Sequence, residues 1–302
     1  MNIDRETYWS GIRKHYRPKQ PLFLNDYIRG EILSEDDFAP IRELVYRLFA
    51  KTLDPEHPND SNTDKGRNRT LTQLSETVRF VLHRDLDLMT ELDLLMYKLL
   101  DRRGLLTGIE GFQFPMNVRA VHPLPPDGYV EGAHATDHRH CDPWVGAPDD
   151  MINCFLYVQA DKDTSILNLY DVKREQIEAC SRFRGSYLEG AHLVNSLYAV
   201  PYTPAAGQFI IFDTFVPHNT VRRQPGMRLS IDFRMRRTNP YGVLDERWDA
   251  GSGGWDYYWY PNTGRAKSFE ERTRDEYARL RKVGNLSGLE FREKNVAKLQ
   301  AQ

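Results

Sequence analysis

The sequence predicts a mainly β protein, an antiparallel sandwich or barrel with helices added at both ends. Three observations predict it: apolar residues at helical spacing before about residue 110, short β-like runs over 111–240, and a charged helical pattern near the C-terminus. No segment repeats at a fixed period. We therefore expect one domain over 1–302, with a helical region over 1–110, a β core over 111–240, and an aromatic loop and helices over 241–302.

The composition is that of a globular protein of 302 residues. Lys and Arg number 41 against 43 Asp and Glu, and 40% of residues are hydrophobic. A net charge of −2 argues against a nucleic-acid partner, which normally requires a basic excess. No apolar run approaches the roughly 18 residues of a membrane span, and no secretion signal is recognised at the start. Three cysteines without a CxxC pair favour a cytoplasmic location.

The first region contains two clear helical patterns. Ser34 and Asp37 resemble a capping box, and apolar residues recur at helical spacing from Phe38 to Phe49. A second stripe runs over 88–100 and ends before Gly104, with a further helix expected from Thr72. These stripes predict helices that pack against the β core.

The β core is predicted from runs that Gly, Pro and Asp separate. The runs are Val118–His122, Ile152–Gln159, Ser165–Tyr170, Gln208–Asp213 and Leu229–Met235. Gly and aromatic residues then alternate over 248–260, as expected of an active-site lid, of packing on the barrel or of a subunit contact. Ser268 and Glu271 predict the start of a C-terminal helix.

A possible metal site begins at His140-Cys141-Asp142. On an extended strand, His140 and Asp142 face the same way and Cys141 faces away. One imidazole and one carboxylate on one face can occupy adjacent positions around a metal, although such a tripeptide alone is weak evidence. His138 shares this face, as a substrate contact, as a hydrogen-bond partner of a metal ligand or as a partly solvated loop residue.

The downstream half adds a histidine and an arginine. His218 follows the strand-like run Phe209–Phe212 after a Pro-containing turn, and Arg228 comes ten residues later. Alternation along the last run places Arg228 and Ser230 on the same polar face. Because an inward arginine is costly without an anion, this pair indicates a carboxylate site.

Together, His140-x-Asp142, His218 and Arg228-x-Ser230 resemble the signature of the iron(II)/2-oxoglutarate-dependent oxygenases. Within that family the sequence is similar to the phytanoyl-CoA hydroxylase group and to oxygenases of antibiotic, aminoglycoside and carbohydrate gene clusters. The resemblance covers about 111–237 and implies a double-stranded β-helix, the jelly-roll or cupin-like barrel, flanked by N- and C-terminal helices.

The resemblance also implies the roles of these residues. His140, Asp142 and His218 would bind Fe(II), while Arg228 and Ser230 would hold the distal carboxylate of the co-substrate 2-oxoglutarate. With O2, such a site oxidises an unactivated C–H bond by hydroxylation, ring closure or desaturation. Either Asn153 or a residue on the next strand, Asn168 or Tyr170, could donate to a co-substrate oxygen.

A small-molecule substrate is expected, and its recognition is the least determined feature. Trp144 and Asp149, with Asp150, could form an acidic, aromatic pocket for an amine- or hydroxyl-rich substrate, or an ordinary solvated loop. A local basic patch over 222–223 and 234–237 is expected to be solvated surface. The sequence does not indicate the oligomeric state.

Two alternatives compete with an oxygenase. The first is a cupin-type metalloenzyme, an isomerase or a dioxygenase without 2-oxoglutarate, that binds metal through His138, His140 and His218. It normally requires a nearby Glu, whereas none occurs here before Glu175, and it leaves Arg228 without an anion. The second is a non-catalytic jelly-roll binding protein.

Overall fold

The chain folds around antiparallel β structure with helices on its flanks. A computed structural model describes residues 4–18, 21–53, 86–114, 116–121, 136–147, 150–160, 164–223, 228–237 and 258–261. The helices are α1 (Arg5–His15), α2 (Glu35–Leu53), α4 (Leu86–Arg102), η2 (Asp142–Val145), η3 (Arg174–Gln176), α5 (Ile177–Ser181) and α6 (Tyr187–Val194). The strands are β1 (Pro21–Leu24), β2 (Ile28–Ile32), β3 (Ile109–Phe114), β4 (Asn117–Val121), β5 (Met151–Gln159), β6 (Ile166–Leu169), β7 (Gln208–Asp213), β8 (His218–Val221), β9 (Arg228–Arg237) and β10 (Tyr258–Pro261). Within these ranges, no helix has the length and apolar character that crossing a membrane requires.

Eight strands form the larger sheet. Their order is β1-β2-β7-β5-β9-β3-β10, and β4 pairs with β9 beside β3. Every pairing is antiparallel. Because β9 has partners on both sides, nearly all of its residues are buried. Both faces of this strand therefore lie inside the protein.

A smaller sheet faces the larger one across a cavity. It consists of β6 and β8, and an isolated bridge between His140 and His218 adds the segment before η2. Residues of both sheets line the cavity, among them Leu167 and Thr220 of the smaller sheet and Phe155 of the larger. Two facing antiparallel sheets confirm the predicted mainly β, jelly-roll type of fold with helical additions.

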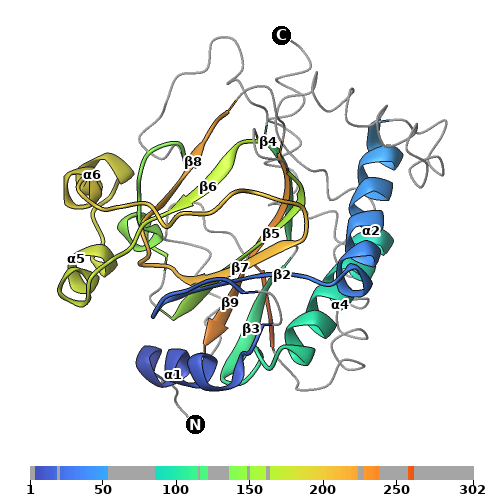
Figure 1. Ribbon diagram of the computed structural model, residues 1–302, viewed down its shortest axis with the longest axis horizontal. Coiled ribbons are helices and arrows are strands. Elements are labelled where there is room, and N and C mark those ends of the chain that lie inside the picture. The colour runs from blue at the N-terminus through green and yellow to red at the C-terminus, as the bar shows by residue number, and fades with distance from the viewer. Residues whose placement is uncertain are drawn as a thin grey trace.

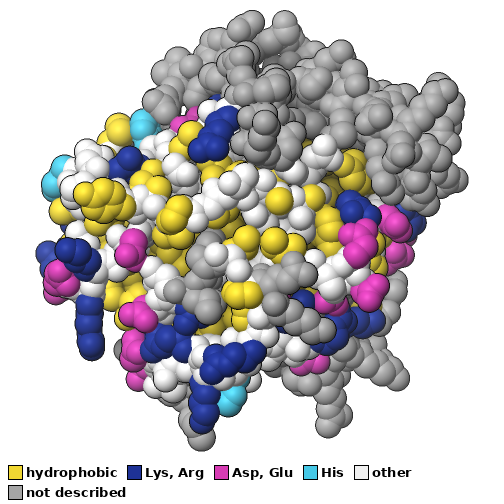
Figure 2. Space-filling view, in the orientation of Figure 1, with side chains coloured by type: hydrophobic (Ala, Val, Ile, Leu, Met, Phe, Trp, Pro, Cys, Tyr) yellow, Lys and Arg dark blue, Asp and Glu magenta, His cyan; other side chains and the backbone are white. Residues whose placement is uncertain are grey.

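The helices cover opposite flanks of this core (Figure 1): α2 and α4 pack together on one side, and α5 and α6 lie on the other. Both strongly predicted helices are confirmed. Ser34 precedes α2, where its Oγ accepts from the amide of Asp37, and Gly104 adopts a φ of 67° just after α4. On the face seen in Figure 2, described acidic and basic side chains are mixed.

The prediction of a mostly helical first region was incomplete, because β1, β2 and the start of β3 lie in it. The strand β2 reads Ile-Arg-Gly-Glu-Ile, and its charges hide the apolar pattern of a buried strand. Glu31 is nevertheless buried. Its carboxylate accepts hydrogen bonds from the Tyr16 hydroxyl and from Arg103 Nε, each at 2.8 Å. Buried polar groups with such partners are compatible with a sheet interior.

Several predictions fall on residues outside the described ranges. These are the helix from Thr72, the aromatic segment before residue 258, and the C-terminal helix from Ser268 with Glu271. The end of the aromatic stretch is described: β10 pairs with β3 at the edge of the larger sheet. The three interpretations of the aromatic stretch, as a lid, as packing on the barrel or as a subunit contact, stay predictions.

Candidate metal centre

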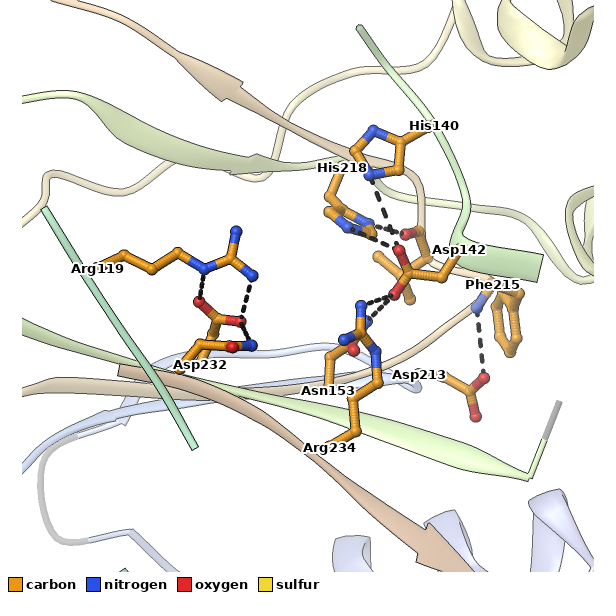
Figure 3. Close-up of polar contacts among 11 residues, drawn as sticks. Arg119, His140, Asp142, Asn153, Asp213, Phe215, His218, Asp232 and Arg234 are labelled. Carbon is orange, nitrogen blue, oxygen red and sulfur yellow. Dashed lines mark hydrogen bonds and ion pairs between the residues drawn. The ribbon is translucent and has the colours of Figure 1, made fainter. Parts of the chain in front are cut away.

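Three buried side chains converge in the cavity between the sheets. The Nε2 atoms of His140 and His218 lie 3.8 and 3.6 Å from Oδ1 of Asp142 (Figure 3). One ligand atom from each residue fits within 4.8 Å of the others, as coordination of a single ion requires. The structure thus brings together the three residues that the sequence singled out as metal ligands.

Hydrogen bonds to the backbone hold the two histidines in place. His140 and His218 exchange backbone N–H···O hydrogen bonds of 2.9 and 2.8 Å. The Nδ1 of each ring contacts the carbonyl two residues earlier, that of His138 at 2.7 Å and that of Val216 at 2.9 Å. These contacts favour a proton on Nδ1 and leave Nε2 as the metal-binding atom. His218 is the first residue of β8, so it lies in a strand and not merely beyond one.

Asp142 lies at the start of a short helix and not within a strand. Cys141 before it is extended, with φ −113° and ψ 136°, and Asp142 then begins η2. The predicted alternation therefore holds for only one step, which is enough to direct both ligands to one side. The strand expected at His140 is reduced to the single bridge with His218.

The second oxygen of Asp142 is fixed by the larger sheet. Its Oδ2 accepts from Asn153 Nδ2 at 2.8 Å and from Arg234 Nη2 at 3.0 Å. Burial alone would raise the pKa of this carboxyl, but Arg234 and the two histidines lower it below its ordinary value. Asp142 is therefore ionised, with Oδ1 directed to the metal position.

Asn153 was expected to donate to a co-substrate oxygen, which stays a prediction; in the structure its amide donates to Oδ2 of Asp142. It also lines the cavity. The alternatives lie elsewhere: the hydroxyl of Tyr170 donates to Asn219 Oδ1 at 2.9 Å, and Asn168 contacts that hydroxyl at 3.4 Å. Neither is among the residues found lining the cavity in the described part of the chain.

The basic patch is solvated surface only in part: Arg223 is exposed as expected, whereas 234–237 is buried. Arg234 and Arg236 are 9% and 3% exposed, and Arg236 Nε lies 2.9 Å from Asp150 Oδ2. Arg222 Nε contacts Asp137 Oδ2 at 3.2 Å. The expectation failed because the patch at 234–237 belongs to β9, which has strands on both sides.

Acid is expected to destabilise the metal-free protein through His140. Burial and the neighbouring His218 lower the pKa of His140 to about 3 from 6.5. Between these values the unfolded chain binds a proton that the folded chain does not. The free energy of unfolding should therefore fall as pH decreases, by up to about 1.4 kcal/mol per pH unit.

Urea unfolding of the metal-free protein at pH 7, 6 and 5 checks this expectation. The variant His140→Gln lacks the titrating group and should lose less stability over the same interval. Equal pH dependence in the two proteins would contradict it.

One aromatic residue at the site was missed. The ring of Tyr187 stacks on His140, with centroids 3.8 Å apart and an interplanar angle of 24°, and it lines the cavity. Tyr187 is the first residue of α6, whose N-cap Ser186 accepts from the amide of Glu189. The pattern Ser186-x-x-Glu189 was the available signal for this helix.

Trp144 connects α6 to the metal-binding turn. It is fully buried, and its carbonyl accepts from the amides of Arg184 and Gly185 at 2.9 and 2.8 Å. Its ring lies against Gly190 of α6. Trp144 is thus a core residue here, and it is not among the residues found lining the described cavity. Asp149, its predicted companion, lies outside the described residues.

The cavity holds a cation with no counterion among the described residues. Its volume is about 220 Å³. Arg228 is 3% exposed, and its Nε and Nη1 have no hydrogen-bond partner within the described ranges; the same is true of Ser230 Oγ. The guanidinium lies 5.2 Å from the centre of the Phe155 ring. Burial lowers the pKa of Arg228, but an arginine stays charged at neutral pH.

His138 contributes its carbonyl to the site, and its half-buried side chain is not among the residues found lining the described cavity. The group that can hold one ion contains Asp142 in its place. This geometry disfavours the cupin alternative, which needs the imidazole of His138 as a ligand.

No family model matches the chain, and no curated protein matches it. Similar solved structures include the non-heme alpha ketoglutarate dependent carbocyclase SnoK from nogalamycin biosynthesis, with TM-score 0.45, 12% identity, and coverage of 88% of this chain and 95% of that one. The non-heme alpha ketoglutarate dependent epimerase SnoN from nogalamycin biosynthesis has TM-score 0.40 and 10% identity, with coverage of 76% of this chain and 82% of that one. HygX from Streptomyces hygroscopicus, solved with nickel and 2-oxoglutarate bound, has TM-score 0.37 and 14% identity, with coverage of 70% of this chain and 83% of that one.

Proposed function

We propose that this chain is an Fe(II)- and 2-oxoglutarate-dependent oxygenase that oxidises an unactivated C–H bond of a small molecule. The observation that carries the proposal is a buried Arg228 in the same cavity as His140, Asp142 and His218, with no hydrogen-bond partner for its Nε and Nη1 in the described part of the chain. A metal site alone would fit many enzyme classes. A metal site beside a buried arginine that can bind a carboxylate fits the 2-oxoglutarate-dependent oxygenases.

The ligand set suits ferrous iron. Two neutral imidazoles and one carboxylate on one side of the ion form the arrangement of non-haem Fe(II) oxygenases and leave its other positions open. His140 and His218 would bind through Nε2 and Asp142 through Oδ1. Asn153 and Arg234 occupy Oδ2, so they keep the carboxylate in a one-oxygen mode.

Arg228 is the best anchor in the cavity for the distal carboxylate of 2-oxoglutarate. Among the described residues, three arginines line the cavity, and two of them are paired, Arg119 with Asp232 and Arg234 with Asp142. A buried cation without a partner is costly, and a carboxylate removes that cost. Ser230 Oγ, two residues along β9, supplies a further donor.

Bound Fe(II), 2-oxoglutarate and O2 supply the oxidation of a C–H bond, coupled to decarboxylation of 2-oxoglutarate to succinate. The chain orients the substrate and excludes water with the rings of Phe155, Phe212 and Phe233, which line the cavity. The outcome is hydroxylation, ring closure or desaturation. We place the reaction in cytoplasmic natural-product, aminoglycoside or carbohydrate metabolism, because of the resemblance in β9 and because all three cysteines are free and buried.

Anaerobic addition of Fe(II) and 2-oxoglutarate tests the proposal. The complex should give a visible metal-to-ligand charge-transfer band that neither component gives alone. Absence of metal uptake would favour a non-catalytic binding protein. A band that survives Asp142→Ala but is lost in His138→Ala would favour the cupin alternative.

Arg228→Gln is expected to weaken 2-oxoglutarate binding by about ten- to a hundredfold, because this loss of affinity corresponds to the free energy of a hydrogen bond to a charged group. Fe(II) affinity should change little, because Arg228 is not a ligand. Titration of the charge-transfer band with 2-oxoglutarate measures the effect. The matched control is Arg182→Gln, on the exposed Arg182–Glu178 pair of the α5 region. An unchanged affinity in Arg228→Gln would contradict the assigned role.

A further inference from the structure

A second charged pair lines the cavity on the larger sheet. Arg119 of β4 binds Asp232 of β9 through two contacts, Nε to Oδ2 at 2.5 Å and Nη2 to Oδ1 at 2.9 Å. Asn117 Nδ2 also donates to Asp232 Oδ1 at 2.9 Å, directly across the two strands. Asp232 is therefore held on two sides, and it fixes the plane of the Arg119 guanidinium.

The opposite edge of that guanidinium has no partner among the residues that the structure describes. Figure 3 shows Arg119 with its third nitrogen, Nη1, directed away from Asp232. The hydrogen bonds and ion pairs found for Arg119 within the described ranges use Nε and Nη2 only. Its side chain is 34% exposed, whereas Arg228 is 3% exposed. An Nη1–Nη2 edge presents two nearly parallel N–H donors, which match the two oxygens of a carboxylate.

The pair lies beside the metal centre. Asp232 and Arg234 are neighbours on one face of β9, about 7 Å apart by strand geometry, and Arg234 contacts Asp142. Arg228 lies on the same face at the start of the strand. A small molecule that places a carbon at the metal can therefore reach Arg119 with a polar end.

The charges of the cavity favour an anion at this edge, a step that rests on the proposed function. Fe(II) and 2-oxoglutarate bring equal and opposite charge. Arg119 and Asp232 cancel, as do Arg234 and Asp142, and Arg228 leaves one positive charge among the described lining residues. A substrate carboxylate would neutralise that charge, whereas an amine would add to it.

We propose that Arg119, oriented by Asp232, determines specificity by binding a carboxylate of the substrate, so that the substrate is a small carboxylic acid. This assignment replaces the amine- or hydroxyl-rich molecule expected from the sequence. That expectation depended on Trp144, Asp149 and Asp150. Trp144 is buried in the core, Asp150 is paired with Arg236, and Asp149 lies outside the described residues.

Matched pairs of carboxylates and neutral amides test the proposal on the Fe(II)–2-oxoglutarate protein. Suitable probes are L-proline and L-prolinamide, phenylacetate and phenylacetamide, and N-acetyl-L-leucine and its amide. Binding is measured anaerobically as perturbation of the charge-transfer band, and succinate release in air is a second readout. Wild type, Arg119→Gln and the exposed control Arg182→Gln are compared.

At least one carboxylate should bind wild type and Arg182→Gln tenfold or more tightly than its amide, and Arg119→Gln should lose this difference. The affinity of Arg119→Gln for 2-oxoglutarate should stay within twofold of wild type. If no carboxylate is preferred, if Arg119→Gln keeps the preference, or if it weakens 2-oxoglutarate as Arg228→Gln does, the proposal is overturned. Failure of the charge-transfer band in wild type would instead refute the proposed oxygenase function.

Discussion

Replacing His218 with alanine is expected to abolish productive Fe(II) binding. The change removes one of only three protein ligands found in the described part of the chain, and it leaves a gap beside Oδ1 of Asp142. Loss of a residue that merely orients a ligand costs about ten- to a hundredfold in metal affinity. Removal of the ligand itself should cost more than about a hundredfold.

Anaerobic titration of the metal-free protein with Fe(II) measures this loss. The backbone bridge between His140 and His218 does not use the side chain, so the fold should survive. Circular dichroism checks that point. His192→Ala, at an exposed position of α6, is the matched control and should bind metal as wild type does. Undiminished Fe(II) affinity in His218→Ala would refute the assigned metal site.

Gly190→Ala is expected to give a large loss of stability for one added methyl group. A Cβ at this position would lie 2.3 Å from Cε3 and Cζ3 of Trp144, far inside a normal contact. Trp144 is fully buried, so its ring is enclosed by other residues. Either α6 or the turn that carries Asp142 must move, at a cost of about 1–3 kcal/mol or more.

Urea unfolding should therefore give a lower midpoint for Gly190→Ala. Fe(II) affinity should fall as well, because α6 also carries Tyr187, which stacks on His140. Gly11→Ala is the control: nothing lies within 4 Å of its Cβ position in α1, and alanine favours a helix by up to about 1 kcal/mol. Restoration of part of the loss by Trp144→Phe would identify the clash as the cause. Equal stability of Gly190→Ala and wild type would contradict it.

The sequence predicted the three residues that converge in the candidate metal centre because their signal is local. A two-residue spacing directs His140 and Asp142 to one side, and a Pro-containing turn after β7 precedes His218. The inward direction of Arg228 follows from strand alternation. These inferences need only the backbone period and the chemistry of each side chain.

What the sequence did not predict depends on contacts between distant segments. Alternation places Asn153 and Arg234 on inward faces, but only the meeting of the sheets shows that both bind Asp142. Trp144 follows the ligands closely in sequence, yet α6 packs over it and removes it from the cavity. The stack of Tyr187 on His140 joins residues far apart in the chain. Tertiary packing, not local pattern, decides each of these.

The histidines of the candidate metal centre and the residues proposed to bind carboxylates come from different sheets. The histidine ligands come from the smaller sheet, whereas Arg119, Asp232 and Arg228 all come from β4 and β9 of the larger. Exchange of residues 119 and 232 can therefore alter which molecules are accepted without rebuilding the coordination of the ion. Under the proposed function, this layout lets one metal centre accept different substrates through a few changes on one sheet.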